Sequence, residues 1–162
     1  MTTTTPATAP AADHSAADAP VADARALGLA HYAARGVLEQ FLTRHDVTFR
    51  QQAVLRAAVT AEDSQTPDGL VAQVHGTLKG DPADIRADVD GLLAKGLLMA
   101  DGTRLFAADA GRELLAAVGA EVAPVSARIW GGIPADDLAA AGRVLALVTE
   151  RANAEFADLT AT

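Results

Sequence analysis

Apolar residues recur at helical spacing in six segments of the chain, separated by polar, Gly- or Pro-containing breaks. Thr48, followed three residues later by Gln51, has the spacing of a capping box, and Asp81-Pro82 places a helix cap directly before a proline. Gly96 is expected to end the fourth helix in the left-handed conformation. The predicted helices span about residues 21–44, 49–61, 68–78, 82–95, 109–130 and 135–156.

Two short apolar runs flank the dipeptide Asp101-Gly102, immediately after the fourth predicted helix. The runs cover residues 97–100 and 103–106. Because Asp-Gly favours the tight turn between antiparallel strands, the pattern predicts a β-hairpin. Asp109 is expected to cap the helix that follows. Short helices followed by a tight hairpin are typical of a winged helix-turn-helix.

The predicted fold class is therefore mostly α. A winged helix-turn-helix at 48–107 carries the short β-hairpin wing, and terminal helices at 23–45 and 109–158 form a dimerisation layer. These helices are rich in Ala and Leu and are suited to pairing with their copies in a second subunit. We expect one domain over 23–162, preceded by a disordered tail at 1–22 that has almost nothing large to bury.

Composition excludes several classes of protein. The chain has no cysteine, so a disulfide and a thiolate metal site are both excluded. We find no apolar run of the ~18 residues that a membrane span needs and no secretory signal pattern, so we expect a cytoplasmic protein without a membrane partner. The formal net charge of −8 gives no global attraction for nucleic acid, and any DNA binding depends on a local basic face.

Patterns of catalytic residues are missing. The four histidines do not have the spacing of zinc ligands, and neither a nucleophile elbow nor a phosphate-binding glycine loop is present. The sequence therefore predicts a protein that is not an enzyme, with no metal and no cofactor.

Three segments of the sequence stand out: VDGLLAKGLL at 89–98, VTFRQQAVL at 47–55 and GIPADDLAAAGRVLALVTERAN at 132–153. They resemble the MarR family of bacterial regulators. The first is similar to the end of that family's recognition helix and its first wing strand. The second resembles the family's entry into its second helix, and the third resembles the last dimerisation helix of actinobacterial members. The resemblance covers residues 27–156. It implies a homodimer that binds double-stranded DNA at a palindromic operator and often responds to a small phenolic or anionic effector.

Four basic residues are candidates for contact with DNA. Arg86 lies near the start of the reading helix, where a base or phosphate contact fits, and Arg104 on the wing is placed for a minor groove. Lys79 and Arg50 are candidates for phosphate contacts. The alternatives are an Arg86 paired with Asp90 four residues on, and an Arg104 that is simply solvated.

A second candidate site would bind a small molecule. In the family that the chain resembles, ligands often lie between the dimer layer and the reading module. His31, Tyr32 and Arg35 carry polar ends suited to a phenolic or anionic ligand, and Trp130 would line an apolar wall. The alternative for Tyr32 and Trp130 is core or dimer packing, and for His31 it is a place at the surface or the core edge.

The reading segment DPADIRADVDGLLAK is acidic, and this leaves two functions open. Residues 66–106 hold six acidic and four basic side chains, a net charge of −2. The favoured function is a ligand-responsive repressor that acts as a homodimer on a palindromic operator. The alternative is a MarR-like protein that has lost DNA reading and binds a small molecule or a protein partner, because acidic groups repel phosphate and attract basic proteins.

Overall fold

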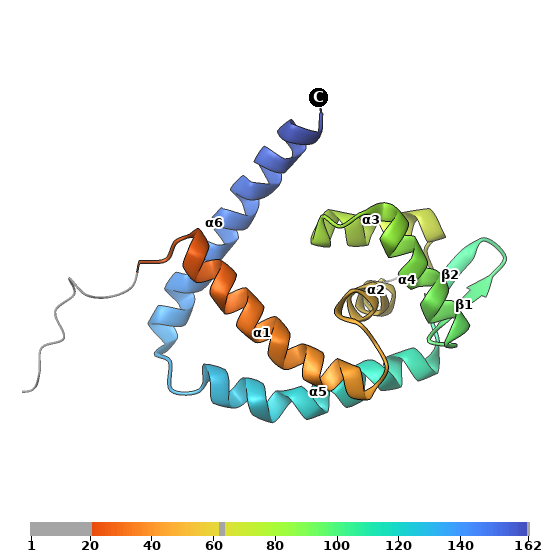
Figure 1. Ribbon diagram of the computed structural model, residues 1–162, viewed down its shortest axis with the longest axis horizontal. Helices are drawn as coiled ribbons and strands as arrows, with labels where there is room; N and C mark the ends of the chain where they lie inside the picture. Colours follow the sequence, from red (N-terminus) through yellow and green to blue (C-terminus); the bar gives the residue numbers. More distant parts are fainter. Residues whose placement is uncertain (1–20, 62–63, 162) are drawn as a thin grey trace, which may run out of the picture.

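The computed structural model describes residues 21–61 and 64–161. In this part of the chain, helices and a two-stranded hairpin follow in the predicted order (Figure 1). All but the last two residues of the predicted tail, 1–22, lie outside the described residues. The elements are α1 Ala24–Arg44, α2 Phe49–Thr60, α3 Pro67–Leu78, α4 Pro82–Ala94, β1 Leu98–Asp101, β2 Arg104–Ala107, α5 Asp109–Trp130 and α6 Ala135–Thr160.

Most of the expected helix caps are confirmed. The Thr48 hydroxyl accepts from the Gln51 backbone N–H at 3.1 Å, and the Thr48 N–H donates to the Gln51 side chain at 3.3 Å. The Asp81 carboxylate accepts from the backbone of Ala83 at 2.7 Å. Gly96 has φ +68°, as the left-handed end of a helix requires.

The prediction that Asp109 caps α5 is wrong. Ala108 occupies the cap position, and it makes no side-chain hydrogen bond to the helix. Asp109 lies instead in the first turn, where its negative charge complements the positive end of the helix dipole.

One apolar core holds the helix-turn-helix and the hairpin together. The apolar side of α2 packs on α3, α4, α5 and β2, and α4 also contacts β1. Burial of the apolar side chains at these contacts is the main source of stability, because helices as short as these are not stable alone. The core side chains with no more than 5% exposure include Val54, Leu55, Leu70, Val74, Ile85, Val89, Leu92, Leu98 and Leu105.

The hairpin is present, but its turn lies one residue later than predicted. Asp101 pairs directly with Arg104, so Gly102 and Thr103 form a two-residue turn. Gly102 has φ +56° and takes the first turn position, where hairpin turns favour glycine. Asp101 therefore belongs to a strand, and the strands begin at Leu98 and Arg104.

The terminal helices form a second layer beside this module. α5 contacts both α1 and α2, and the chain then bends sharply so that α6 turns back and brings Phe156, near its C-terminal end, close to His75 on α3 (Figure 1). No residue of α6 is buried. Within the described residues no single helix has the length and apolar composition needed to cross a membrane; α5 and α6 meet those criteria only together, as a pair bent by 107°.

Gly111 lets α5 approach Leu97, the residue before β1, and Leu55 on α2 closely. A Cβ at this position would overlap the Leu97 carbonyl and lie 2.9 Å from a methyl group of Leu55. We expect Gly111→Ala to lower the free energy of unfolding by about 1–3 kcal/mol, because a packed core resists added volume. Gly119→Ala, on the same helix with nothing within 4 Å, should instead raise it by up to about 1 kcal/mol. Urea unfolding measures both, and equal stability of the two variants would contradict the close packing.

Candidate functional site

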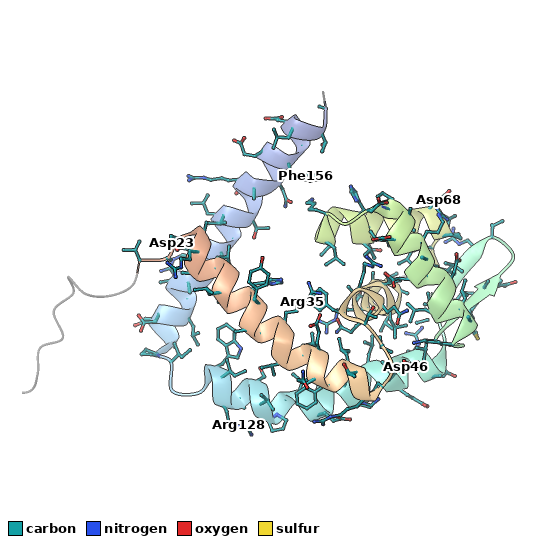
Figure 2. The ribbon with its side chains drawn as sticks, in the orientation of Figure 1. Asp23, Arg35, Asp46, Asp68, Arg128 and Phe156 are labelled. Carbon is teal, nitrogen blue, oxygen red and sulfur yellow. The ribbon has the colours of Figure 1, made fainter. Side chains whose placement is uncertain are left out.

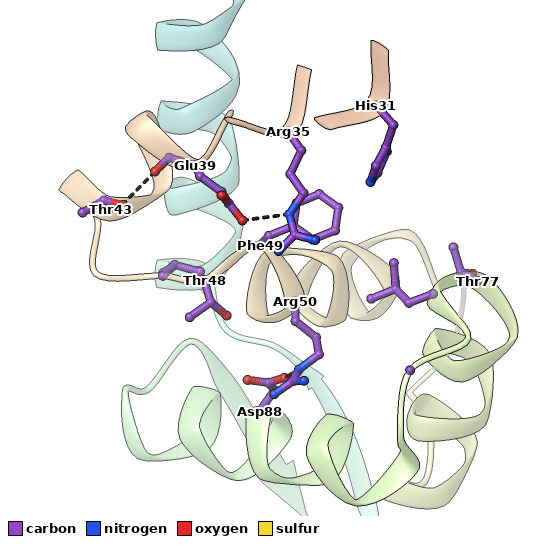
Figure 3. A pocket seen from close by; sticks show the side chains of 12 residues that line it. His31, Arg35, Glu39, Thr43, Thr48, Phe49, Arg50, Thr77 and Asp88 are labelled. Carbon is purple, nitrogen blue, oxygen red and sulfur yellow. Dashed lines mark hydrogen bonds and ion pairs between the residues drawn. The ribbon is translucent and has the colours of Figure 1, made fainter. Parts of the chain in front are cut away.

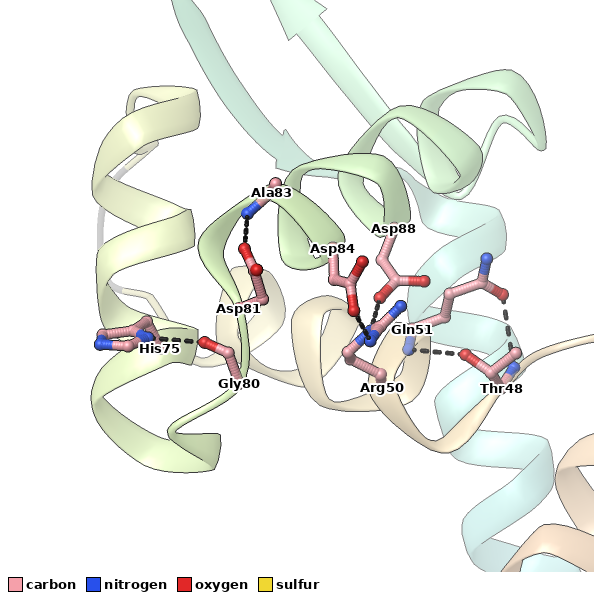
Figure 4. A network of polar contacts seen from close by, with 9 residues as sticks. All are labelled: Thr48, Arg50, Gln51, His75, Gly80, Asp81, Ala83, Asp84 and Asp88. Carbon is pink, nitrogen blue, oxygen red and sulfur yellow. Dashed lines mark hydrogen bonds and ion pairs between the residues drawn. The ribbon is translucent and has the colours of Figure 1, made fainter.

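A tightly held turn sets the angle between α3 and α4. Lys79 adopts a left-handed backbone with φ +54°, and the His75 ring donates from Nδ1 to the Gly80 carbonyl at 2.7 Å. Asp81, the residue after Gly80, is the N-cap of α4 (Figure 4). These bonds fix the two helices as a helix-turn-helix with α4 as its second helix, the one predicted to read DNA.

The outer side of α4 is free for contact with a large partner. Ile85, Val89 and Leu92 face the core, which turns the opposite side of the helix to solvent. That side presents short side chains and two charges of opposite sign, on Arg86 and Asp90. Such a surface fits the major groove sterically, but it carries little positive charge. Its exposed residues are Ala83, Arg86, Ala87, Asp90 and Ala94.

Arg86 is paired, although not with the partner that its own helix offers. Its guanidinium bonds to the carboxylate of Asp68 on α3, so the expected alternative pairing with Asp90 is wrong. The side chains of Arg86 and Asp68 are 47% and 85% exposed. Because an exposed ion pair contributes less than about 1 kcal/mol, Asp68 gives up this arginine at little cost. A contact between Arg86 and DNA stays a prediction.

Arg104 and Lys79 also have partners inside the chain. Arg104 donates from Nε to the Ser64 hydroxyl at 2.9 Å and from a second nitrogen to the Ser64 carbonyl. Lys79 donates to the Gly76 carbonyl at 2.7 Å, and its ammonium lies 5.1 Å from the ring centre of Phe156. Figure 2 labels Phe156 on α6. The contacts of Arg104 and Lys79 with DNA remain predictions as well.

An open cavity of about 780 Å³ lies between α1, α2 and the turn after α3 (Figure 3). This volume is in the range of small-molecule sites. Of the four residues predicted to bind a ligand, His31 and Arg35 line it and the other two do not: Tyr32 is 71% exposed and Trp130 56%. The lining residues are His31, Arg35, Glu39, Thr43, Val47, Thr48, Phe49, Arg50, Thr77, Leu78, Gly80 and Asp88.

Arg35 is held by a partner on its own helix. Its Nε donates to Glu39 Oε1 at 2.8 Å, one turn along α1. The guanidinium also lies 4.7 Å from the ring centre of Phe49, in the geometry of a cation–π contact. Charge and aromatic surface therefore meet at one wall of the cavity.

Arg50 connects the cavity wall on α2 to the reading helix. It donates from Nε to the carboxylate of Asp88 and from Nη1 to Asp84 Oδ2 at 2.9 Å (Figure 4). The hydrogen bond to Asp88 raises the pKa of Arg50 above its usual value, so the guanidinium stays charged. Arg50, which the sequence predicts to contact phosphate, thus lines the cavity and binds the carboxylates of Asp84 and Asp88.

The sequence contains only part of the signal for this bridge. Asp84 and Asp88 are four residues apart, which places both carboxylates on one side of α4. Nothing in the sequence says that Arg50, 34 residues before Asp84, faces them. Within 21–61 and 64–161, no three His, Asp or Glu side chains are grouped to hold a metal ion.

Loss of the Arg50–Asp88 bond should destabilise the module. The Asp88 side chain is only 10% exposed and Arg50 is 40% exposed. We expect Asp88→Ala to unfold at a lower urea concentration than Asp90→Ala, with a difference of about 1–3 kcal/mol, because only Asp88 makes a charged hydrogen bond across elements. The matched control Asp90→Ala changes the same helix and the same charge at an exposed position. Equal unfolding midpoints would mean that the bridge contributes nothing.

Comparison with solved structures finds the same architecture in bacterial regulators. A MarR-family transcriptional regulator from Rhodococcus sp. RHA1 is 24% identical, covers 74% of this chain and 86% of its own, and has a TM-score of 0.62. CouR from Rhodococcus jostii RHA1, bound to p-coumaroyl-CoA, gives the same values. The reduced form of MarR from E. coli is 18% identical, with 82% and 97% covered and a TM-score of 0.63.

These likenesses establish the fold as a MarR-like winged helix, which confirms the predicted fold class. No family profile matches the chain, and no curated protein matches it. Identities below 25% carry the fold alone, and the resemblance to actinobacterial members in particular stays a prediction.

Proposed function

We propose that this protein is a ligand-responsive, DNA-binding transcriptional regulator and not an enzyme. The observation that carries the proposal is a winged helix-turn-helix whose α4 turns a continuous outer side of small side chains and Arg86 to solvent. In this arrangement α4 enters the major groove and the β1–β2 wing lies along the backbone. Arg86 contacts a base edge or a phosphate, and Arg104 on the wing contacts the minor groove.

The acting form is a homodimer built from the terminal helices. A 26-residue helix such as α6 that buries none of its side chains in its own chain needs a partner for its apolar side. In a two-fold symmetric dimer, the apolar side of α6 in one subunit packs against the same surface of the second copy. The exposed apolar residues of the layer are Leu27, Leu29, Tyr32, Ile129, Trp130, Ile133, Val144, Leu145, Leu147, Val148 and Leu159.

A two-fold dimer presents two copies of α4 to the duplex. Its operator is therefore an inverted repeat, with half-sites about one helical turn apart. Tyr32 and Trp130, which lie outside the cavity, belong in this scheme to the contact between subunits.

The cavity between α1, α2 and the α3–α4 turn holds the effector. Its arginines and His31 suit an anionic or phenolic group, and Phe49 and Leu78 offer apolar surface. The neighbour CouR is bound to p-coumaroyl-CoA, a phenolic ligand, which supports the same chemical class here. Binding shifts the position of α4 and so changes operator affinity.

A second function is favoured by the charges of the module. Arg50, Arg86 and Arg104 all bond to groups of their own chain, and α4 with its cap carries Asp81, Asp84, Asp88 and Asp90. A MarR-like protein with such a face would bind a small molecule or a basic protein and no DNA. The DNA titration below separates the two functions.

Binding to DNA from upstream of the protein's own gene, measured by fluorescence anisotropy, tests the regulator. We expect affinity that falls steeply with salt, because phosphate contacts release counterions. Arg86→Ala should weaken binding by about 5- to 100-fold. Asp68→Asn, which removes the carboxylate that holds Arg86, should strengthen it by about 2- to 5-fold.

Arg143→Ala is the matched control, since Arg143 is an exposed arginine on α6, outside the reading module. It should leave the affinity unchanged. Equal weakening by Arg86→Ala and Arg143→Ala would mean that α4 does not read DNA. No binding at low salt by the folded protein would favour the second function.

Sedimentation equilibrium tests the dimer. We expect Leu145→Glu to raise the dimer dissociation constant by at least about 10-fold, because it places a charge in an apolar interface. Ala146→Glu adds the same charge one residue on, next to Arg143 and Glu150 on the polar side of α6, and should leave a dimer. A monomeric wild type, or equal behaviour of the two variants, would rule out this interface.

A further inference from the structure

Phe156, near the end of α6, contacts the winged-helix module of its own chain (Figure 2). Its ring centre lies 6.4 Å from that of His75 and 5.1 Å from the ammonium of Lys79. Both partners lie at the end of α3, next to the turn that leads into α4. Of the 26 residues of α6, only Leu138 and Phe156 are partly buried. The contact is therefore exceptional on a helix whose other side chains face solvent.

The two residues that Phe156 contacts also shape the turn between α3 and α4. The His75 ring donates from Nδ1 to the Gly80 carbonyl, and the Lys79 ammonium donates to the Gly76 carbonyl, both at 2.7 Å. Lys79 has φ +54°, a conformation that a residue with a side chain keeps only where its surroundings restrain it. The ring of Phe156 thus packs on the side chains that hold a strained turn in place.

The nature of the contact makes it more than incidental packing. The face of an aromatic ring is electron-rich, so it attracts an ammonium group at this distance. The half-buried edge of His75 adds apolar and aromatic surface beside the same ring. An aliphatic side chain at position 156 would supply part of the apolar contact but none of the attraction for Lys79.

The two ends of α6 are fixed in different ways. Its start is fixed by the chain itself, through the bend of 107° that follows α5. Its far end is fixed by Phe156 against α3, so that α6 leaves the layer of α1 and α5 and returns to the module (Figure 1). The position of the α3–α4 turn relative to α6 therefore depends on this contact.

We propose that Phe156 is a positioning residue, which holds the α3–α4 turn against α6 and so fixes the reading helix relative to the dimer layer. This rests on the proposed function only in assigning DNA reading to α4 and dimerisation to α6. In a two-fold dimer, two such contacts keep the two copies of α4 at the separation that a duplex requires. A larger fraction of the free protein is then competent to bind, which raises the apparent affinity.

The test measures the distance between α4 and α6 within one subunit by double electron–electron resonance. Because the chain contains no cysteine, nitroxide labels attach only at introduced cysteines. Ala87→Cys on α4 and Ala154→Cys on α6 are both at exposed positions, and position 154 points to another side of the helix than Phe156. An excess of unlabelled wild type gives dimers with one labelled chain, so every measured distance lies within a subunit.

We expect a narrow distance distribution in the wild-type background and a broader one in Phe156→Leu, which keeps an apolar side chain and loses the aromatic face. Phe156→Tyr, which restores the ring, should restore the narrow distribution. Lys79→Met removes the cation from the other side of the contact and should also broaden the distribution. Phe156→Leu/Lys79→Met should be no broader than Phe156→Leu, because both substitutions remove the same contact.

The upstream-DNA titration gives a second readout. Phe156→Leu should weaken binding by about 2- to 5-fold, the effect of losing one exposed cation–π contact. Its salt dependence should match that of wild type, because no phosphate contact is lost. Phe156→Tyr should bind as wild type does. Asn153→Ala is the matched control at an exposed position one turn earlier on α6, and it should change neither the distance nor the affinity.

Equal distance distributions in wild type and Phe156→Leu would overturn the proposal, as would a broad distribution in wild type. Sedimentation of the same samples excludes another origin of the effect. If Phe156→Leu is monomeric while Lys79→Met is a dimer, Phe156 belongs to the contact between subunits and the proposal is wrong. If circular dichroism shows that Phe156→Leu does not fold, Lys79→Met decides, and an unchanged distribution in that variant overturns the proposal.

The distance measurement involves no DNA. Failure of the upstream-DNA titration by wild type would therefore reject the regulator and leave the Phe156 contact standing. Failure of the distance test would reject the positioning role and leave DNA binding intact.

Discussion

The fold of the winged-helix module depends on burial of the apolar side of α2. The helices α3, α4 and α5 and strand β2 all pack against α2 and cover that side. Val54 and Leu55 are fully buried against α3, α4 and the hairpin, while Phe49 and Arg50 on the same helix face the cavity. One short helix thus supports the core on one side and a binding site on the other.

The negative charge of the winged-helix module limits how it can bind DNA. Net charge over 66–106 is −2, and the basic groups near the reading surface are each held by the chain itself. In the proposed regulator, DNA binding would depend on the fit of α4 and on a few exposed, weakly held arginines more than on a broad positive field. A separate cluster, Arg50 with Asp84 and Asp88, joins the cavity wall on α2 to α4.

Local signals in the sequence predicted the elements well, because caps such as Thr48 and Asp81 and the helical spacing of apolar residues act within a few positions. The exceptions are also local: Asp109 lies inside its helix, and the hairpin turn shifts to Gly102-Thr103 because glycine takes the positive φ. The site was less predictable. Arg50 meets Asp88, and Lys79 meets Phe156, only through the tertiary fold.

The most direct test of the account is selection of bound duplexes from a random double-stranded pool by the purified protein at low salt. We expect enrichment of an inverted repeat whose half-sites lie about one helical turn apart, since a two-fold axis relates the two copies of α4 in the proposed dimer. A pool that stays random after repeated rounds, with protein that is folded and dimeric, would contradict it and show that the acidic α4 no longer reads DNA.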